Sequence, residues 1–128
     1  MSGEDLTNLI KTLQKFTTEK SRPFTDLKVK LEVVELPKKN TYHVAARGYI
    51  NTFYPKDKRY APYALNYGVY LDVAYAYRYR NDLPELKQAI LHELAHLFGS
   101  KMKHDTQFKK VAKQLGVDMN HQRQKWSD

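Results

Sequence analysis

The stretch ILHELAHLF, residues 90–98, carries two histidines four positions apart, His92 and His96, with Glu93 directly after the first. In an α-helix, residues four apart lie on one face one turn apart, so both imidazoles can point at a single position. Two such imidazoles, beside a carboxylate that can take a proton from water, are typical of a hydrolytic zinc site. The pattern therefore predicts Zn²⁺ bound by His92 and His96, with Glu93 as the catalytic acid/base.

A third histidine, His104, follows eight residues after His96. A tight connection folds the next helix back beside the preceding one, so His104 can reach the same metal from outside the motif helix. The alternative is a core helix that carries two surface histidines, with His104 as a separate surface residue. The motif helix is apolar around most of its circumference, where unpaired polar side chains cost on the order of a few kcal/mol to bury. This favours a shared metal ligated by all three histidines.

Local signals set the bounds of the elements around the motif. The motif helix is predicted over residues 83–98, with Asp82 as its cap, Pro84 in its first turn and Gly99 ending it in the left-handed conformation. A second helix is predicted over residues 105–115, ending at Gly116. Residues 117–128 form a tail.

The chain before the motif predicts a helix and three strands. Apolar residues recur at helical spacing over residues 4–20, and Pro23 ends that pattern. Alternating residues predict strands over 27–36 and 41–53, joined as a hairpin through a turn at 37–40, and a long strand over 68–80. The prolines and charges of residues 54–62 indicate a loop. The fold class expected is α+β, with a small, mostly antiparallel sheet of about three strands.

Composition bounds the function further. The 128 residues fit a single domain, and the absence of cysteine excludes disulfides and thiolate ligands, so any zinc must be held by nitrogen or oxygen atoms. The amino terminus lacks the basic and apolar run of a secretory signal, and no stretch of eighteen apolar residues occurs. A soluble cytoplasmic protein with no membrane partner is expected.

The charge balance is basic. Lys and Arg number 22 against 14 Asp and Glu, a net charge of +8, which attracts phosphate backbones but also keeps small proteins soluble. Lys56, Lys58 and Arg59 can contact phosphate or simply solvate their loop. The ten tyrosines can stack on bases or cover the edge of the core. A DNA contact through the basic surface therefore stays an alternative.

The segments AILHELAHL (residues 89–97) and HDTQF (residues 104–108) resemble the SprT-like zinc metallopeptidases, a family that includes Spartan. The resemblance covers residues 86–116, and residues 27–80 follow the family only in element order. It implies a minimal zincin-like fold with zinc on His92, His96 and His104 and Glu93 as acid/base. Asp105 stands where family members often have glycine, and the cysteine-rich zinc ribbon of many members has no counterpart here.

The leading expectation is a zinc-dependent metallopeptidase that hydrolyses peptide bonds in a protein or peptide substrate. Spartan-type enzymes degrade proteins crosslinked to DNA, so the resemblance also raises DNA-associated proteins as substrates. In zincins generally, a strand beside the metal helix binds substrate by edge pairing, and residues 68–79 are the candidate. Two alternatives remain: a non-catalytic, zinc-stabilised binding module, and a basic nucleic-acid-binding protein that uses the lysine-rich final quarter and the tyrosines.

Overall fold

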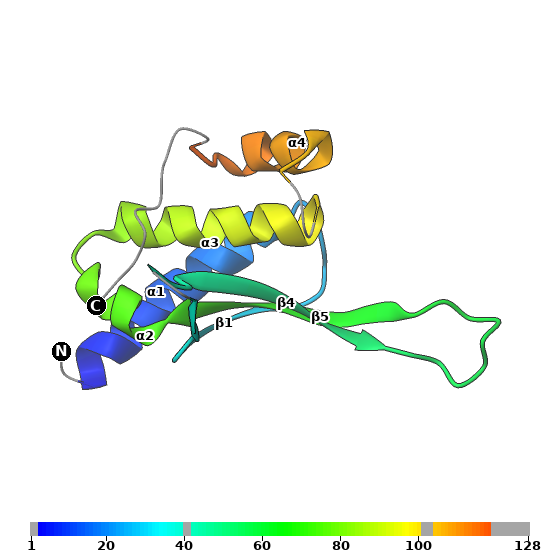
Figure 1. The fold of residues 1–128 in the computed structure, drawn as a ribbon, viewed down its shortest axis with the longest axis horizontal. Coiled ribbons are helices and arrows are strands. Elements are labelled where there is room, and N and C mark those ends of the chain that lie inside the picture. Colours follow the sequence, from blue (N-terminus) through cyan, green and yellow to red (C-terminus); the bar gives the residue numbers. More distant parts are fainter. Residues whose placement is uncertain (1–2, 40–41, 101–103, 119–128) are drawn as a thin grey trace.

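The computed structural model describes residues 3–39, 42–100 and 104–118 (Figure 1). Within them the chain forms four helices and a small sheet, an α+β arrangement as the sequence predicts. None of the described helices combines the length and the apolar character needed to cross a membrane. The elements in chain order are α1 (Gly3–Ser21), β1 (Val29–Val34), β2 (Lys38–Lys39), β3 (Tyr42–His43), β4 (Ala46–Phe53), β5 (Tyr63–Asp72), α2 (Val73–Arg78), α3 (Leu83–Phe98) and α4 (Thr106–Leu115).

The three-stranded sheet has the order β1-β5-β4, with β5 parallel to β1 and antiparallel to β4. The sheet is therefore mixed rather than mostly antiparallel, and the hairpin predicted between residues 27–36 and 41–53 is wrong because β5 lies between them. β5 suits the centre because it is covered on both faces. Val69 and Leu71 are fully buried on one face, and the Tyr49 ring covers Gly68 on the other.

The predicted strand at residues 41–53 is divided into β3 and β4. β3 pairs with β2 in a separate antiparallel ribbon, so Lys38 and Lys39 lie in a strand rather than in the predicted turn. Residues 40–41, between these two strands, lie outside the described residues.

The long strand predicted at residues 68–80 is wrong beyond Asp72, where the chain turns into α2. The buried Asp72 side chain accepts one hydrogen bond from the Tyr75 backbone N–H (3.1 Å) and another from the Leu36 N–H (2.9 Å). The first bond caps α2. The alternating tyrosines match a strand period, but this cap starts a helix, and the Tyr75 hydroxyl donates to Glu85 at 2.8 Å instead of lining a sheet.

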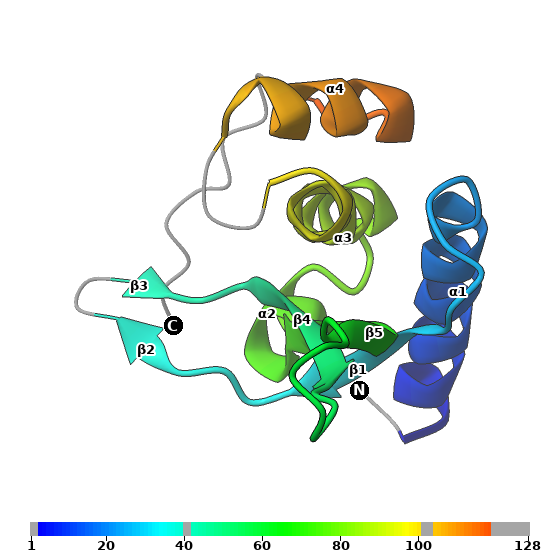
Figure 2. The ribbon, with the colours of Figure 1, turned by 90° about the vertical axis from the view of Figure 1, so that its right-hand side faces the viewer.

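Helices α1, α3 and α4 form layers on one face of the sheet (Figure 2). α1 packs on β1, α3 packs on β4 and β5, and α4 covers α3. The side-chain amide of Gln14 fastens α1 to β1, because it donates to the Val29 carbonyl (2.9 Å) and accepts from the Leu31 N–H (2.7 Å). Between the layers lies the buried core, which includes Leu13, Leu31, Val69, Leu71, Leu86, Ile90, Leu94, Phe108 and Leu115.

Strands β4 and β5 continue past the helices as an arm, residues 51–65, that projects from the rest of the molecule (Figure 1). Its loop is the one predicted at residues 54–62. At the tip, Arg59 forms an ion pair with Asp57 at 2.7 Å, and hydrogen bonding from Arg59 lowers the pKa of the Asp57 carboxyl below its ordinary value. The large hydrophobic side chains exposed on the arm are Phe53, Tyr54, Tyr60, Tyr63 and Leu65.

Candidate metal centre

The structure brings His92, His96 and His104 together. The Nε2 atoms of His92 and His96 are 3.2 Å apart, and the Nε2 of His104 lies 3.4 Å from the first and 3.1 Å from the second. The three residues form a group that can hold a metal ion. His92 and His96 are half-buried on α3, whereas His104 is exposed just before α4.

Hydrogen bonding alone does not account for this arrangement. Each Nε2 of a neutral imidazole is either a donor or an acceptor. Among three mutually close nitrogens, two must have the same role, so at least one of the three contacts cannot be a hydrogen bond. A single cation between them satisfies all three lone pairs at once.

A backbone contact determines which ring nitrogen of His96 carries the proton. The Nδ1 atom of His96 lies 2.7 Å from the backbone carbonyl oxygen of Ser100. Because a carbonyl can only accept, Nδ1 carries the hydrogen, and the neutral ring then presents its lone pair at Nε2, toward the other two histidines. A hydrogen bond from the ring nitrogen that points away from the metal is typical of metal-ligating histidines.

Local sequence explains how the two helices position these side chains. Asp82 caps α3 by accepting from the Glu85 N–H (3.3 Å), with Pro84 in the first turn, as predicted. Asp105 caps α4 by accepting from the Phe108 N–H (3.1 Å). The short connection between the helices, part of which lies outside the described residues, therefore ends with His104 directly before a fixed cap.

Gly99 and Gly116 end the two helices differently. Gly116 ends α4 with a φ of 83°, in the left-handed region, as predicted. Gly99 has a φ of −112°, so its predicted left-handed conformation is wrong. It serves a close approach instead: a Cβ there would lie 2.6 Å from the Ala95 carbonyl oxygen and 3.0 Å from the Phe108 Cα. This contact brings the start of α4 down onto the end of α3.

Glu93 lies in α3, half-buried, directly after His92 and three residues before His96. Residues three apart share a helix face, so Glu93 and His96 are neighbours on the surface of α3. The chain has two further histidines: His121 lies outside the described residues, as does the side chain of His43.

The edge strand beside α3 differs from the predicted one. Residues 68–79 cannot provide a sheet edge, because β5 is the central strand and continues into α2. The edge strand packed on α3 is β4: a Cβ at Gly48 would lie 3.0 Å from the Leu97 Cγ, next to His96 in the sequence. Gly48 thus lets β4 approach the motif helix closely.

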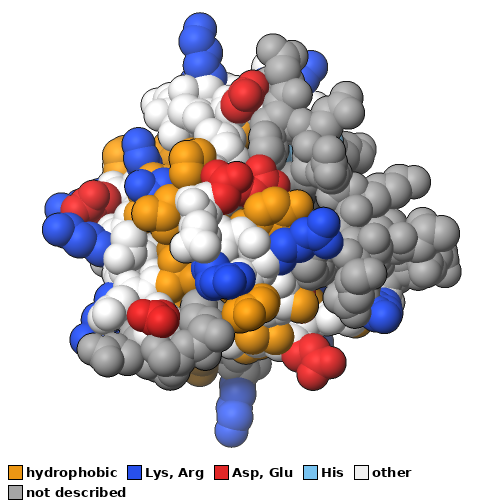
Figure 3. Space-filling view, turned by 90° about the vertical axis from the view of Figure 1, so that its left-hand side faces the viewer, with side chains coloured by type: hydrophobic (Ala, Val, Ile, Leu, Met, Phe, Trp, Pro, Cys, Tyr) orange, Lys and Arg blue, Asp and Glu red, His pale blue; other side chains and the backbone are white. Residues whose placement is uncertain are grey.

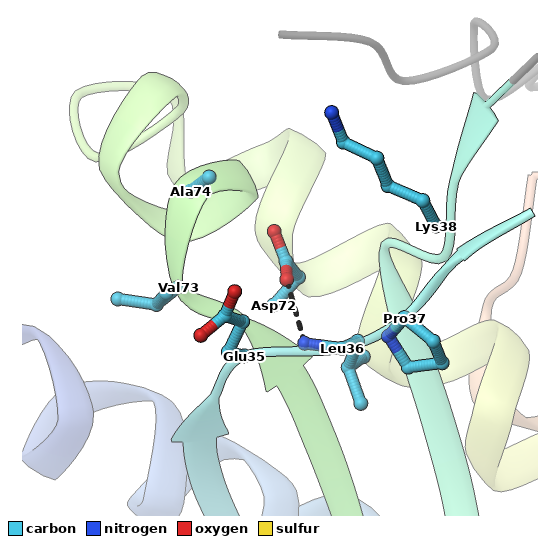
Figure 4. A pocket seen from close by; sticks show the side chains of 7 residues that line it. All are labelled: Glu35, Leu36, Pro37, Lys38, Asp72, Val73 and Ala74. Carbon is cyan, nitrogen blue, oxygen red and sulfur yellow. Dashed lines mark hydrogen bonds between the residues drawn. The ribbon is translucent and has the colours of Figure 1, made fainter.

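A pocket of about 620 Å³ lies at the end of β1 and β5, where α2 begins (Figure 4). Both carboxylate oxygens of Asp72, which lines it, accept backbone hydrogen bonds, so this side chain has a structural role there. None of the described residues that line the pocket is a histidine, and the pocket is separate from the cluster of His92, His96 and His104. Its lining residues are Glu35, Leu36, Pro37, Lys38, Asp72, Val73 and Ala74.

Two contacts of the histidine cluster were not predicted from the sequence: the Ser100 carbonyl and the ring of Phe108. The signal for Phe108 was its position four residues after His104. Comparisons of this chain with protein-family models, curated proteins and solved structures found no match.

Proposed function

We propose that this protein is a zinc-dependent peptide hydrolase, with His92, His96 and His104 as metal ligands and Glu93 as general base and acid. The observation that carries the proposal is the convergence of three Nε2 atoms at 3.1–3.4 Å, two of them from an HExxH sequence on α3.

The donor set fits zinc. Nitrogen ligands at about 2.0–2.1 Å in a tetrahedral array lie roughly 3.3–3.4 Å apart, close to the observed separations. Imidazole is a poor match for Mg²⁺ and Ca²⁺, which prefer oxygen ligands. Structural zinc sites are usually closed by four protein ligands, whereas three histidines leave one position for water or substrate. The exposure of His104 gives solvent access to this side.

Bound zinc would supply Lewis-acid chemistry, lowering the pKa of a coordinated water and polarising the scissile carbonyl. Glu93 would accept the proton of the attacking water and deliver it to the leaving amine. The contact with the Ser100 carbonyl would keep the lone pair of His96 directed at the site.

An extended substrate would pair with the outer edge of β4, which no other described strand covers and which belongs to the strand packed on α3. Main-chain hydrogen bonds along such an edge bind a peptide with little dependence on its sequence. A catalytic site beside β4 therefore suits an unfolded or extended segment of a protein. Residues 86–116 also lead us to propose a relationship to the SprT-like metallopeptidases.

The proposal is tested by metal analysis of the wild type and of two kinds of variant. Purified protein should contain one zinc per chain, and His92→Ala, His96→Ala or His104→Ala should lose it. Glu93→Gln should keep zinc and lose cleavage of an unfolded protein substrate by about 10²–10⁴-fold, the range for a general acid–base. Retained zinc with cleavage unchanged in Glu93→Gln contradicts the catalytic role. Zinc in a wild type that cleaves no substrate would instead favour a zinc-stabilised binding module.

The exposed arm favours a second function, the binding of single-stranded nucleic acid. Tyr54 and Tyr60 are 72% and 65% exposed, beside the exposed Lys56 and Lys58. Aromatic faces interleaved with cations bind single strands by stacking and charge. At the opposite end of the molecule, basic, acidic and hydrophobic side chains are intermixed (Figure 3), so the arm is the better site. Substrates bound to DNA would then be held near the metal helix.

Anisotropy titration with a fluorescent single-stranded oligonucleotide tests this second function. The double variant Tyr54→Ala/Tyr60→Ala should bind at least about tenfold more weakly, given roughly 1–3 kcal/mol for each stacked base. Tyr77→Ala is the matched control, because Tyr77 is also exposed but belongs to α2. If wild type and both variants bind the oligonucleotide with equal affinity, or if binding does not weaken with salt, nucleic-acid binding by the arm is contradicted.

A further inference from the structure

Phe108 contacts every residue of the histidine cluster. Its ring centroid lies 5.3 Å from that of His92, 4.5 Å from that of His96 and 4.6 Å from that of His104. The side chain is only 1% exposed. The cluster therefore has one aromatic side chain beneath all three imidazoles, although the imidazoles come from two different parts of the chain.

We propose that Phe108 is a positioning residue for the metal site, which holds the three imidazoles with their Nε2 atoms converged before the ion binds. The inference rests on the proposed zinc binding by these histidines. An unpacked histidine rotates about two side-chain bonds, and a metal must order each such ligand when it binds. A ring packed against all three restricts these rotations when the protein folds, so the ion meets an ordered site.

The backbone around Phe108 holds the ring in place. Its N–H donates to the Asp105 carboxylate at 3.1 Å, which fixes the first turn of α4. Its Cα lies so close to Gly99 that a Cβ on that glycine would approach within 3.0 Å. Phe108 is thus held between the end of α3 and the start of α4, the two segments that carry the ligands.

The ring also gives the site two unlike sides. Phe108 is buried and apolar beneath the imidazoles, whereas His104 is exposed. An apolar shell excludes water from the inner side of the ligands and strengthens their interaction with a cation. Solvent and substrate then approach from the side of His104.

Zinc affinity of the full chain, measured by competition with a chromophoric chelator, tests the proposal. Phe108→Leu keeps an apolar side chain but removes the ring, and should weaken zinc binding by about 10–100-fold, the range for outer contacts of a metal site. Phe108→Met, which fills irregular space, is a second variant should the leucine variant fold poorly. The Co²⁺-loaded variants should also lose intensity in the visible bands of a tetrahedral site.

Leu115→Ala is the matched control, because Leu115 is buried on the same helix but lies in its last turn. It should lower stability while leaving zinc affinity within about threefold of wild type, since the ligands stay packed on Phe108. Unchanged affinity in both Phe108 variants overturns the proposal, and so does an equal loss in Leu115→Ala.

Failure of the proposed hydrolysis is a separate outcome. If the wild type binds zinc but cleaves nothing, the proposed hydrolase function is wrong. The affinity comparison then still supports or overturns the role of Phe108. If the wild type cleaves its substrate and the Phe108 variants keep full zinc affinity, only the positioning role of Phe108 is contradicted. A wild type that binds no zinc overturns both.

Discussion

The Nδ1 of His96 donates a hydrogen bond to the backbone carbonyl of Ser100, four residues further along the chain, at 2.7 Å. The acceptor is main chain, so no side-chain substitution at residue 100 deletes it. The orientation of the His96 ring therefore depends on the path that the chain takes as it leaves α3. Gly99 is the first residue of that path and lies close to the backbone of Ala95, Gln107 and Phe108.

We expect Gly99→Ala to weaken metal binding at a distance from the ligands. Its Cβ would lie 2.6 Å from the Ala95 carbonyl oxygen and 3.0 Å from the Gln107 carbonyl oxygen, so α4 must shift away from α3. Overpacking of this kind costs about 1–3 kcal/mol of folding stability. Chemical denaturation and zinc titration measure the two effects.

Gly116→Ala is the control for this variant. It strains a residue with a φ of 83° but adds a Cβ into open space at the far end of α4. It should lower stability by about 1–2 kcal/mol without changing zinc affinity. Loss of zinc affinity in both glycine variants would show that α4 stability alone governs the site.

Removal of the metal should lower the melting temperature. A ligand that binds only the folded state stabilises it by about 2.7 kcal/mol at a free concentration 100 times its Kd. Thermal unfolding with zinc and after chelation measures the difference, and His104→Ala should abolish it. A melting temperature that is the same with and without chelator would contradict metal binding by the native fold.

Asp72→Asn should destabilise the fold more than Asp82→Asn. The Asp72 carboxylate accepts from both Leu36 and Tyr75 and is buried, and asparagine offers only one acceptor oxygen. A buried N–H left unsatisfied costs about 1–3 kcal/mol. Asp82 is an exposed cap that accepts from Glu85, and asparagine caps helices equally well. Equal denaturation midpoints for Asp72→Asn and Asp82→Asn would contradict the double role of Asp72.

Gln14→Leu should loosen α1 from β1. It removes both hydrogen bonds to the strand, at 2.9 and 2.7 Å, in a half-buried position, and we expect a loss of about 1–3 kcal/mol. Gln88→Leu is the control, because its amide also bonds twice to the backbone, but these bonds are exposed and go to the exposed residues Gly116 and Asp118. The Gln88 variant should change the free energy of unfolding by less than about 0.5 kcal/mol.

Helix bounds could be predicted from the sequence because their signals are local. Asp82 and Asp105 both cap the helices that follow them, and α3 spans the predicted residues 83–98. The same local geometry explains why the spacing of His92 and His96 predicted that they share a face. His104 could be expected near His92 and His96 because the sequence leaves only a short connection between the two predicted helices.

Strand pairing could not be predicted, because alternation indicates which residues share a face but not which strand lies beside another. β5 therefore appeared as an edge rather than as the centre of the sheet. α2 had a local signal in Asp72, but the alternating tyrosines after it matched a strand period equally well. The Ser100 and Phe108 contacts depend on how α4 lies against α3, which no local pattern specifies.

The central position of β5 also bears on how this chain folds during synthesis. β1 and β4 leave the ribosome before β5, yet each has β5 as its neighbour in the sheet. Neither strand can complete its pairing until Tyr63–Asp72 has emerged, and the motif helix that packs on β4 and β5 follows later still. The nascent amino-terminal half therefore holds unpaired strand edges, the kind of segment that chaperones protect.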